Sequence, residues 1–325
     1  MSGLRFVLLL VLVLSGCRES ANPEIHKLTV AYTTQPQCTL LHVAQAKGFF
    51  AEEKLDVQPR LFTFGKMALQ ELLEDRADLA TAAETPIMFN ILKGEKIFVL
   101  ANIDTSTTNN AIVARKDAGI VQPTDLAGKR IALSPGTTSD FFLSTFLIAN
   151  GLSRQQIHEL PLKPEEMQEA IVHGRVDAIS TWNYPLTQIV QALGANGTTF
   201  FDRDIYTETY NLVAKQEFVQ KNPAILERFL RALIKAERFT QQQPLVAQEI
   251  VAQAIHVNRE LVRSVWNNFG YRIVLDQILL IMLEDETRWA MSHGLAKPAA
   301  MPDYLSYIHF DALKAVKPEA IRIKR

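Results

Sequence analysis

The sequence predicts an α/β protein made of two doubly wound lobes joined by a two-stranded hinge, with a helical C-terminal extension packed on the first lobe. One observation is the length of 325 residues, which is too long for one ordinary core and suits two or three α/β units. A second is a repeat, because residues 72–86 recur as residues 171–185 at a constant offset of 99 positions. In each copy a helix-like apolar segment leads into Arg-x-Asp, a run typical of a buried strand, a polar loop and a proline. A unit that occurs twice predicts two similar lobes with a cleft between them.

The first 17 residues have the features of an export signal. Arg5 forms a minimal positive region, and residues 6–14 are an apolar run that is too short to span a bilayer as a permanent helix. The run ends in Leu-Ser-Gly-Cys17, which resembles the lipobox of bacterial lipoproteins. We therefore expect residues 1–16 to be a signal peptide, Cys17 to carry lipid at the mature N-terminus, and residues 17–27 to form a tether. The alternative is an ordinary signal peptide or an uncleaved anchor.

The first lobe begins with strands and helices in alternation. Thr39 can cap a helix that ends at Gly48, and an Arg-x-Asp turn precedes the last strand of the unit. This order is typical of a doubly wound sheet. The expected elements are strands at 25–32 and 57–62, helices at 39–47 and 67–73, and the strand that follows Asp78.

The second lobe repeats this order. A loop of small polar residues at 134–139 separates its first strand from its first helix, and Asn150-Gly151 ends that helix. The expected elements are strands at 131–133 and 157–162, helices at 140–149 and 165–173, and the strand that follows Asp177.

Two similar strands border the second lobe. Residues 110–115 enter it and residues 210–215 leave it, so both are natural hinge crossings. We expect the first lobe to comprise residues 28–112 and 207–325, and the second to be an insertion at residues 113–206. After residue 215 the pattern is almost wholly helical, and a looser tail follows residue 294. The expected C-terminal helices span 223–241, 244–256, 259–268 and 275–292.

Composition excludes several classes of function. The 34 Lys and Arg residues balance the 35 Asp and Glu residues, so no overall charge favours nucleic acid. If Cys17 carries lipid, Cys38 has no disulfide partner and is expected to be a small packed residue. The seven His residues show no metal-binding spacing, and neither a Gly-x-Ser-x-Gly elbow nor a phosphate loop occurs. We therefore expect no catalytic residues, no metal and no cofactor.

The candidate binding residues follow from the rule that ligands of open α/β sheets sit beyond the carboxyl ends of the strands. The rule selects four loops, at 32–37, 83–85, 136–139 and 182–184, which should face one another across the cleft. The turn after the second strand and the hinge add further residues. The candidate ligand-binding residues are Thr34, Gln35, Phe64, Glu84, Thr85, Asn109, Thr137, Thr138, Ser139, Trp182, Asn183 and Tyr210.

Three of these positions have a structural alternative. The Gly-Thr-Thr-Ser loop at 136–139 can offer free N–H groups at a helix start to an anion, or Thr137 or Thr138 can simply cap that helix. Trp182 can stack on a ligand or pack between the lobes. Glu84 can bind an amine or cap the helix that follows it. The Arg-x-Asp turns lie at the opposite edge and are expected to be scaffold.

In this order the motifs resemble the solute-binding proteins of bacterial ABC importers, in the branch that binds sulfonates, taurine, nitrate and pyrimidine precursors. The similarity covers roughly residues 28–289. It rests on Ala-Lys-Gly-Phe-Phe at 46–50, Arg-Ala-Asp-Leu-Ala at 76–80, Asp-Leu-Ala-Gly-Lys-Arg-Ile-Ala at 125–132, Gly-Thr-Thr-Ser-Asp-Phe at 136–141, and Val-Asp-Ala at 176–178 with Trp182.

The resemblance implies a type II periplasmic-binding-protein fold that closes around a small solute and docks on permease subunits. By position, the ligand contacts of the family fall on Thr34, Gln35, Glu84, Thr137, Thr138 and Trp182. Many relatives continue from the Trp with Asp-Pro, whereas Asn183 and Tyr184 follow here. The four loops contain no Arg or Lys, so an anion would depend on amides and hydroxyls, and a neutral or zwitterionic solute remains open.

The expected function is that of a monomeric, lipid-anchored protein on the periplasmic side of the cell envelope. It would deliver a small anionic or zwitterionic organic solute to an ABC importer and contact the membrane through the lipid on Cys17. One alternative is an exported enzyme on the same fold, a lyase of a carboxylated ring with Glu84 as its acid or base. Another is a ligand-sensing partner of a membrane kinase.

Overall fold

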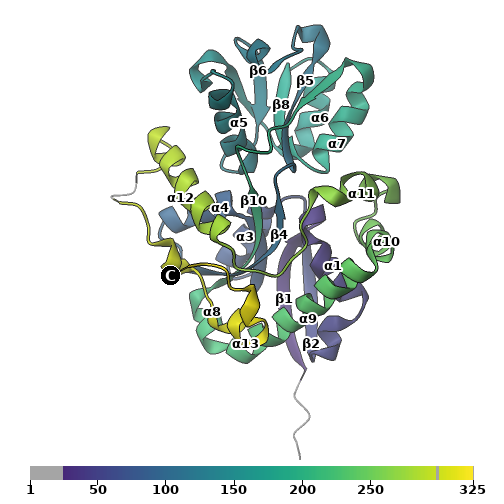
Figure 1. Cartoon of the computed structure of the whole chain (residues 1–325), viewed down its shortest axis with the longest axis vertical. Coiled ribbons are helices and arrows are strands. Elements are labelled where there is room, and N and C mark those ends of the chain that lie inside the picture. Colours follow the sequence, from purple (N-terminus) through teal and green to yellow (C-terminus); the bar gives the residue numbers. More distant parts are fainter. Residues whose placement is uncertain (1–24, 298–299, 325) are drawn as a thin grey trace, which may run out of the picture.

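The computed structural model describes residues 25–297 and 300–324, which form two α/β lobes stacked along the long axis of the molecule (Figure 1). The expected signal peptide, the lipid-bearing Cys17 and most of the tether lie outside these residues. Each lobe contains one five-stranded sheet, with strand orders β2-β1-β3-β10-β4 and β7-β6-β8-β5-β9. The predicted fold class, two doubly wound lobes, is confirmed.

Lobe 1 is built on parallel pairing of β1 with β2 and β3, while β10 runs antiparallel between β3 and β4. Its helices cover the sheet because apolar residues recur on their inner faces, and Leu40, Leu41 and Phe229 are fully buried there. The elements are β1 (His26–Thr33), α1 (Thr39–Ala46), α2 (Phe49–Glu52), β2 (Leu55–Phe62), α3 (Gly65–Leu73), β3 (Leu79–Ala83), α4 (Glu84–Leu92), β4 (Ile97–Ser106) and β10 (Glu208–Lys215).

Lobe 2 repeats this arrangement, since β6 pairs in parallel with β7 and β8 and β5 runs antiparallel between β8 and β9. Phe142 and Phe146 of α5 anchor that helix in the core. The elements are β5 (Asn110–Arg115), β6 (Arg130–Leu133), α5 (Thr138–Ala149), β7 (His158–Pro161), α6 (Pro164–Val172), β8 (Ala178–Trp182), α7 (Pro185–Leu193) and β9 (Gly197–Phe200).

The chain crosses between the lobes twice, between β4 and β5 and between β9 and β10 (Figure 1). The strands predicted as hinge crossings, β5 and β10, lie directly after these crossings. Each is the antiparallel strand of the sheet that the chain has just reached. The hinge therefore consists of the residues just before β5 and β10.

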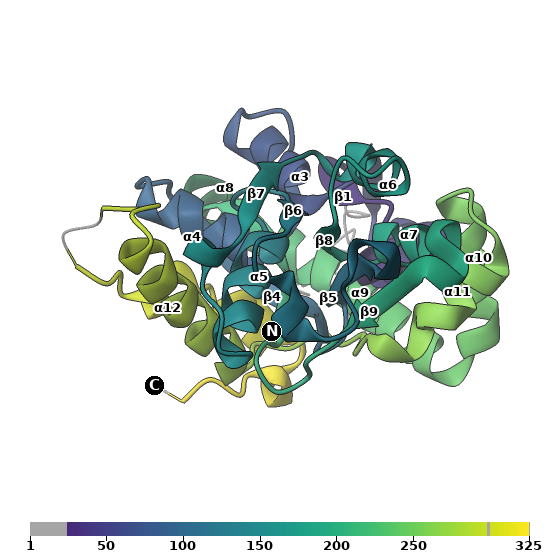
Figure 2. The ribbon, with the colours of Figure 1, turned by 90° about the horizontal axis from the view of Figure 1, so that it is seen from above.

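The C-terminal helices surround lobe 1, as predicted, but α8 was not predicted and α13 forms within the segment expected to be a looser tail. α9 packs on α1 and α2, and α12 packs on α4 with its C-terminal end directed toward lobe 2 (Figures 1 and 2). Helix α10 lies against α1, on the side of lobe 1 away from α12. The elements are α8 (Gln216–Lys221), α9 (Pro223–Gln242), α10 (Pro244–Ala254), α11 (Arg259–Val265), α12 (Gln277–Ser292) and α13 (Asp311–Val316).

The Asp of each Arg-x-Asp turn makes an equivalent hydrogen bond in its lobe. The Asp78 carboxylate accepts the N–H of Thr29 in β1 (2.8 Å), and the Asp177 carboxylate accepts the N–H of Arg130 in β6 (2.9 Å). Each aspartate thus joins the turn to the neighbouring parallel strand, on the edge away from the cleft. The repeated motif is scaffold, as expected.

Two further properties concern the described residues. No helix among residues 25–297 and 300–324 is long and apolar enough to cross a membrane. Cys38 is buried and free, and its sulfur lies 3.3 Å from the hydroxyls of Thr33 and Thr81. It is a packed residue of the lobe 1 core.

Candidate functional site

The carboxyl ends of β1, β3, β6 and β8 meet where the lobes face each other, and a cavity lies between them. Its volume is about 20 Å³, which is room for about one water molecule. The cleft is therefore closed around a small space that both polar and aromatic side chains line. The lining residues are Gln35, Gln37, Phe64, Gly65, Lys66, Ala83, Pro86, Thr137, Thr138, Trp182, Glu208 and Tyr210.

Two hydrogen bonds join the lobes at the rim of the cleft. The Lys66 ammonium at the start of α3 donates to the backbone oxygen of Pro135 (2.9 Å), and the Thr63 hydroxyl donates to Glu165 of α6 (2.5 Å). The first bond links lobe 1 to the loop before α5, and the second links it to the first turn of α6. They stabilise the closed arrangement of the two lobes.

The lobe 2 wall is the start of α5. The Thr137 hydroxyl donates to the backbone oxygen of Ser134 (2.7 Å), and the Thr138 hydroxyl donates to the side chain of Asn110 (3.0 Å). Thr137 is the residue before the helix, but its side chain makes no capping bond, so the expectation that it caps α5 through its hydroxyl is wrong. The backbone N–H groups of Thr138 and Ser139 have no acceptor among the described residues. They are available to an acceptor group in the cleft.

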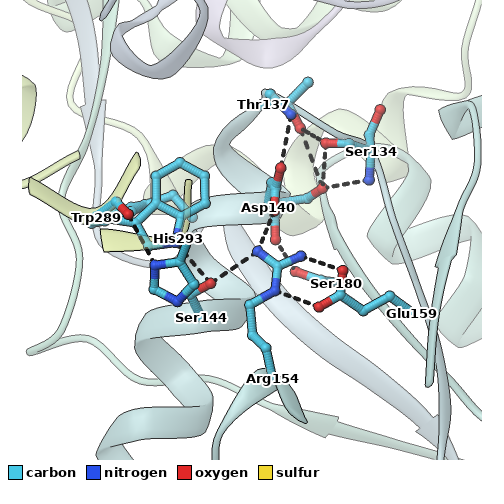
Figure 3. Close-up of polar contacts among 12 residues, drawn as sticks. Ser134, Thr137, Asp140, Ser144, Arg154, Glu159, Ser180, Trp289 and His293 are labelled. Carbon is cyan, nitrogen blue, oxygen red and sulfur yellow. Dashed lines mark hydrogen bonds and ion pairs between the residues drawn. The ribbon is translucent and has the colours of Figure 1, made fainter. Parts of the chain in front are cut away.

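An ion network behind this wall holds the loop in place (Figure 3). Asp140 accepts the N–H of Gly136 (2.9 Å) and pairs with the Arg154 guanidinium (2.6 Å), which also contacts Ser144 and Glu159. The aspartate is nearly buried, and the arginine neutralises it. The first turn of α5 is thereby fixed without placing a side-chain carboxylate in the cavity.

Trp182 ends β8 and forms the aromatic part of the cavity together with Phe64 of lobe 1. The two ring centroids are 6.4 Å apart and the rings are tilted by 47°. Trp182 is 4% exposed, and its indole N–H has no hydrogen-bond partner among the residues that the structure describes. A buried donor without an acceptor is costly, so this N–H is suited to an acceptor on a ligand.

Lobe 1 contributes a carboxylate to the cavity. Glu208 at the start of β10 accepts amide N–H groups from Gln37 (3.1 Å), Asn109 (2.9 and 3.0 Å) and Asn110 (2.5 Å). Burial raises the pKa of Glu208, while the amide hydrogen bonds lower it. Since Asn109 and Asn110 precede and begin β5, this carboxylate also ties the two hinge crossings together.

Two further carboxyl groups are buried behind the cavity. Glu84 begins α4, and its oxygens accept hydrogen bonds from the Tyr206 hydroxyl and from Thr209. Burial, with the nearby charge of Glu208, raises the pKa of Glu84 to about 8. Burial also raises the pKa of Glu286 on α12, which accepts from Thr85 (2.5 Å). The acidic cluster therefore runs from the cleft toward the C-terminal helix.

The structure brings half of the predicted ligand-binding residues to the cavity wall and places the other half behind it or at its rim. Glu84 and Thr85 are fully buried away from the cavity, and Thr34 lines a neighbouring groove. Glu84 therefore does not reach the position that an acid or base of the enzyme hypothesis would need. The lining residues are Gln35, Phe64, Thr137, Thr138, Trp182 and Tyr210, and those outside the lining are Thr34, Glu84, Thr85, Asn109, Ser139 and Asn183.

Three polar lining residues were missed in the sequence. Gln37 belongs to a selected loop but has no distinguishing pattern, and Lys66 follows the Phe64-Gly65 turn. Glu208 lies two residues before the predicted strand at 210–215. Its position as an acidic residue beside a predicted hinge strand could have marked it as a candidate. The four predicted loops contain no Arg or Lys, but Lys66 of α3, which lies outside those loops, lines the cavity. Within residues 25–297 and 300–324 no group of His, Cys, Asp and Glu could hold a metal ion.

Comparison with known proteins relates this site to a family. The sequence profile described as NMT1/THI5 like matches residues 35–247. The taurine-binding periplasmic protein of Escherichia coli (strain K12) is 26% identical over 226 residues, which cover 68% of this chain and 67% of that protein. The formylaminopyrimidine-binding protein of Halalkalibacterium halodurans is 24% identical over 248 residues, or 73% of this chain and 74% of that protein.

A solved structure shows the same fold. The periplasmic aliphatic sulphonate-binding protein of Escherichia coli superposes with a TM-score of 0.76 at 17% identity, covering 88% of this chain and 98% of that chain. The similarity includes both lobes. At this identity the likeness establishes the fold.

Proposed function

Since the chain belongs to the NMT1/THI5-like family, we propose that it is a solute-binding protein that captures a small organic solute between its lobes and delivers it to an ABC importer. The observation that carries this proposal is the small cavity, lined by polar and aromatic side chains, at the carboxyl ends of strands from both lobes. The names of the relatives, which bind taurine and a formylaminopyrimidine, support a small polar solute. A solute bound between the lobes would contact both of them and hold them together.

Several finer features belong to the same proposal. The predicted lobe boundaries, residues 28–112 and 207–325 for lobe 1 and 113–206 for lobe 2, apply except that residues 110–112 belong to β5 in the lobe 2 sheet. The six predicted residues of the cavity wall contact the solute. The protein acts as a monomer outside the cytoplasm, and lipid on Cys17 anchors it to a membrane. Its protein partners are the permease subunits of the importer, which it meets after the lobes have closed.

The decisive experiment identifies the solute. The protein is purified without refolding, and the small molecules released from it are identified by mass spectrometry. Thermal unfolding is then measured with a broad panel of small acids, amines and heterocycles. At least one compound should raise the Tm of the protein. The compound should be recovered unchanged after incubation. A panel in which no compound raises Tm or closes the lobes would refute capture, and conversion of the bound compound would favour an enzyme.

A further inference from the structure

Four carboxyl groups are buried together between the cleft and helix α12. Glu84 at the start of α4 and Glu286 on α12 are fully buried, and Glu208 on β10 and Asp104 on β4 are nearly so. For the other three groups, burial raises the pKa and the charge of Glu208 raises it further. Buried carboxylates that act on one another in this way cannot all be ionised. The cluster therefore holds protons at neutral pH.

No basic side chain of the described residues neutralises this cluster. The ion pairs formed by residues 25–297 and 300–324 include none of the four carboxyl groups. The other titratable groups on which the four act are themselves acids, namely Cys38, Tyr206, Tyr210, Tyr271 and Tyr304. Protons, rather than cations, therefore balance the charge of the cluster.

The remaining charged groups on the elements packed against α4 are bound elsewhere. These elements are α3, α5, α12, β3 and β10. Their pairs are Glu71 with Arg60 and Arg76, Asp140 with Arg154, Arg288 with Glu284 and Asp285, and Lys215 with Asp75, while Lys66 donates to the backbone oxygen of Pro135.

Glu84 and Glu286 form the part of the cluster that titrates near neutral pH. One oxygen of Glu286 accepts from the Thr85 hydroxyl (2.5 Å), and the other has no donor among the described residues, which disfavours the ionised form. Glu84 accepts from the Tyr206 hydroxyl and from the N–H and hydroxyl of Thr209 (2.8 and 3.0 Å). Burial, with the charge of Glu208, nevertheless raises the pKa of Glu84 to about 8. Because the two carboxyl groups interact, we treat them as one titrating pair.

The hinge connects this pair to lobe 2. Tyr206 belongs to the crossing from β9 to β10, and its hydroxyl donates to Glu84 in lobe 1. Its ring lies against Phe141 and Phe142 of α5 in lobe 2, with ring centroids 5.4 and 6.3 Å away. One side chain thus contacts the pair and the other lobe at the same time.

Helix α5 also contacts the helix that carries Glu286. Three residues further along α12, the Trp289 indole N–H donates to Ser144 of α5 (2.9 Å; Figure 3). In the closed form α5 therefore covers both α4 and α12. Opening of the lobes moves α5 away from them and admits water to the pair.

We infer that closure of the lobes takes up a proton at the pair formed by Glu84 and Glu286, so that the solute is held more tightly at lower pH. This goes beyond solute capture and rests on the proposed function only for the role of closure. In the open form water solvates an ionised carboxylate, so the pair binds its proton less tightly there. The stabilisation of the closed form is therefore present at low pH and is lost as the pH rises through about 8.

The test measures closure of the lobes without any solute. Fluorescence energy transfer between labels on the two lobes reports the ratio of closed to open molecules from about pH 6 to about pH 9. The ratio should fall at least about threefold over this range, since the uptake of one proton can change it by up to about tenfold per pH unit.

Three variants assign this pH dependence to the pair. Glu84→Gln combined with Glu286→Gln keeps the shape of both side chains and removes the proton site, so this double variant should close equally across the range. Tyr206→Phe keeps the ring on α5 but removes a donor that lowers the pKa of Glu84, so the fall in closure should move to higher pH. Glu217→Gln, on the exposed face of α8, is the matched control and should behave as the wild type.

The outcomes separate this inference from the proposed function. Closure that is constant over the range, that increases with pH, that keeps its full pH dependence in the double variant, or that falls at an unshifted pH in Tyr206→Phe would overturn the inference and leave solute capture standing. If the lobes respond to pH as expected but no compound of the broad panel binds, solute capture fails and proton-linked closure stands.

Discussion

At the residue scale, Glu84 couples the stability of the protein to pH. Burial, with the nearby charge of Glu208, raises the pKa of Glu84 to about 8 in the fold, against 4.5 for an ordinary glutamate. The folded protein therefore holds a proton that the unfolded chain releases. The resulting stabilisation is fully present below about pH 4.5 and is lost as the pH rises to about 8.

Replacing this carboxyl should flatten the pH dependence of stability. In Glu84→Gln the side chain stays neutral, so the decline in the free energy of unfolding between pH 5 and pH 8.5 should shrink by a few kcal/mol. Urea unfolding at several pH values measures this, with Glu217→Gln as a matched exposed control. Parallel profiles for the wild type and Glu84→Gln would contradict the assignment.

His42 lowers the stability of the fold at acidic pH. The ring is buried against the backbone oxygen of Thr33 (3.1 Å), and burial lowers the pKa of His42 to about 4. Its contribution to stability is lost as the pH falls from 6.5 through 4. Glu84 and His42 thus act in opposite directions, and the two together place the stability maximum at mildly acidic pH.

At the element scale, the start of α3 depends on the missing side chain of Gly65. A Cβ there would lie 2.6 Å from the Tyr210 hydroxyl oxygen and 3.0 Å from Cα of Ala82. Helix α3 can therefore approach β3 and β10 closely only with glycine at this position.

Gly65→Ala should lower the free energy of unfolding by about 1–3 kcal/mol, because α3 must move away from the sheet. Denaturant unfolding checks the loss. Adding Tyr210→Phe removes the nearest clashing atom, so the double variant should be more stable than the sum of the two single changes implies. If the two changes are simply additive, the Tyr210 hydroxyl is not the group that clashes with the new Cβ.

Helix α12 connects the two lobes behind the cleft. Its Trp289 donates an indole N–H to Ser144 of α5 (2.9 Å; Figure 3). The Trp289 ring also contacts Phe89 of α4 and Phe141 of α5. A C-terminal helix of lobe 1 thereby contributes to the closed position of lobe 2.

Trp289→Phe should shift the lobes toward the open form, because it removes the hydrogen bond to Ser144. At about 1 kcal/mol for that bond, solute affinity should fall about fivefold. Fluorescence energy transfer between labels on the two lobes and calorimetry measure the two effects. Trp266→Phe, at a Trp that packs on Tyr271 in lobe 1, is the matched control and should leave interlobe distance and affinity unchanged.

At the scale of the whole molecule, the expected lipid anchor makes a prediction about location. Cys17→Ala should move the exported protein from the membrane fraction to the soluble fraction, because the lipid attachment site is lost. Fractionation and mass spectrometry of the mature N-terminus check this. A variant that remains in the membrane fraction would point to an uncleaved anchor.

The sequence predicted the fold better than it predicted the site, for physical reasons. Strand β5 and the repeated Arg-x-Asp turns follow from local patterns, so residues 110–115 were placed as observed. The chemistry of the cleft depends on contacts between distant residues. Glu208 binds Gln37, Asn109 and Asn110, which are 171, 99 and 98 positions away, and no local pattern contains that information.

The two rim contacts, Lys66 to Pro135 and Thr63 to Glu165, have a consequence for the speed of capture. If each contributes about 1 kcal/mol, together they reduce the open population about thirtyfold, and only open molecules admit a solute. Stopped-flow binding rates should therefore level off as solute concentration rises, at the rate of lobe opening. The same contacts slow the opening of the lobes, so they should lengthen the residence time of a bound solute.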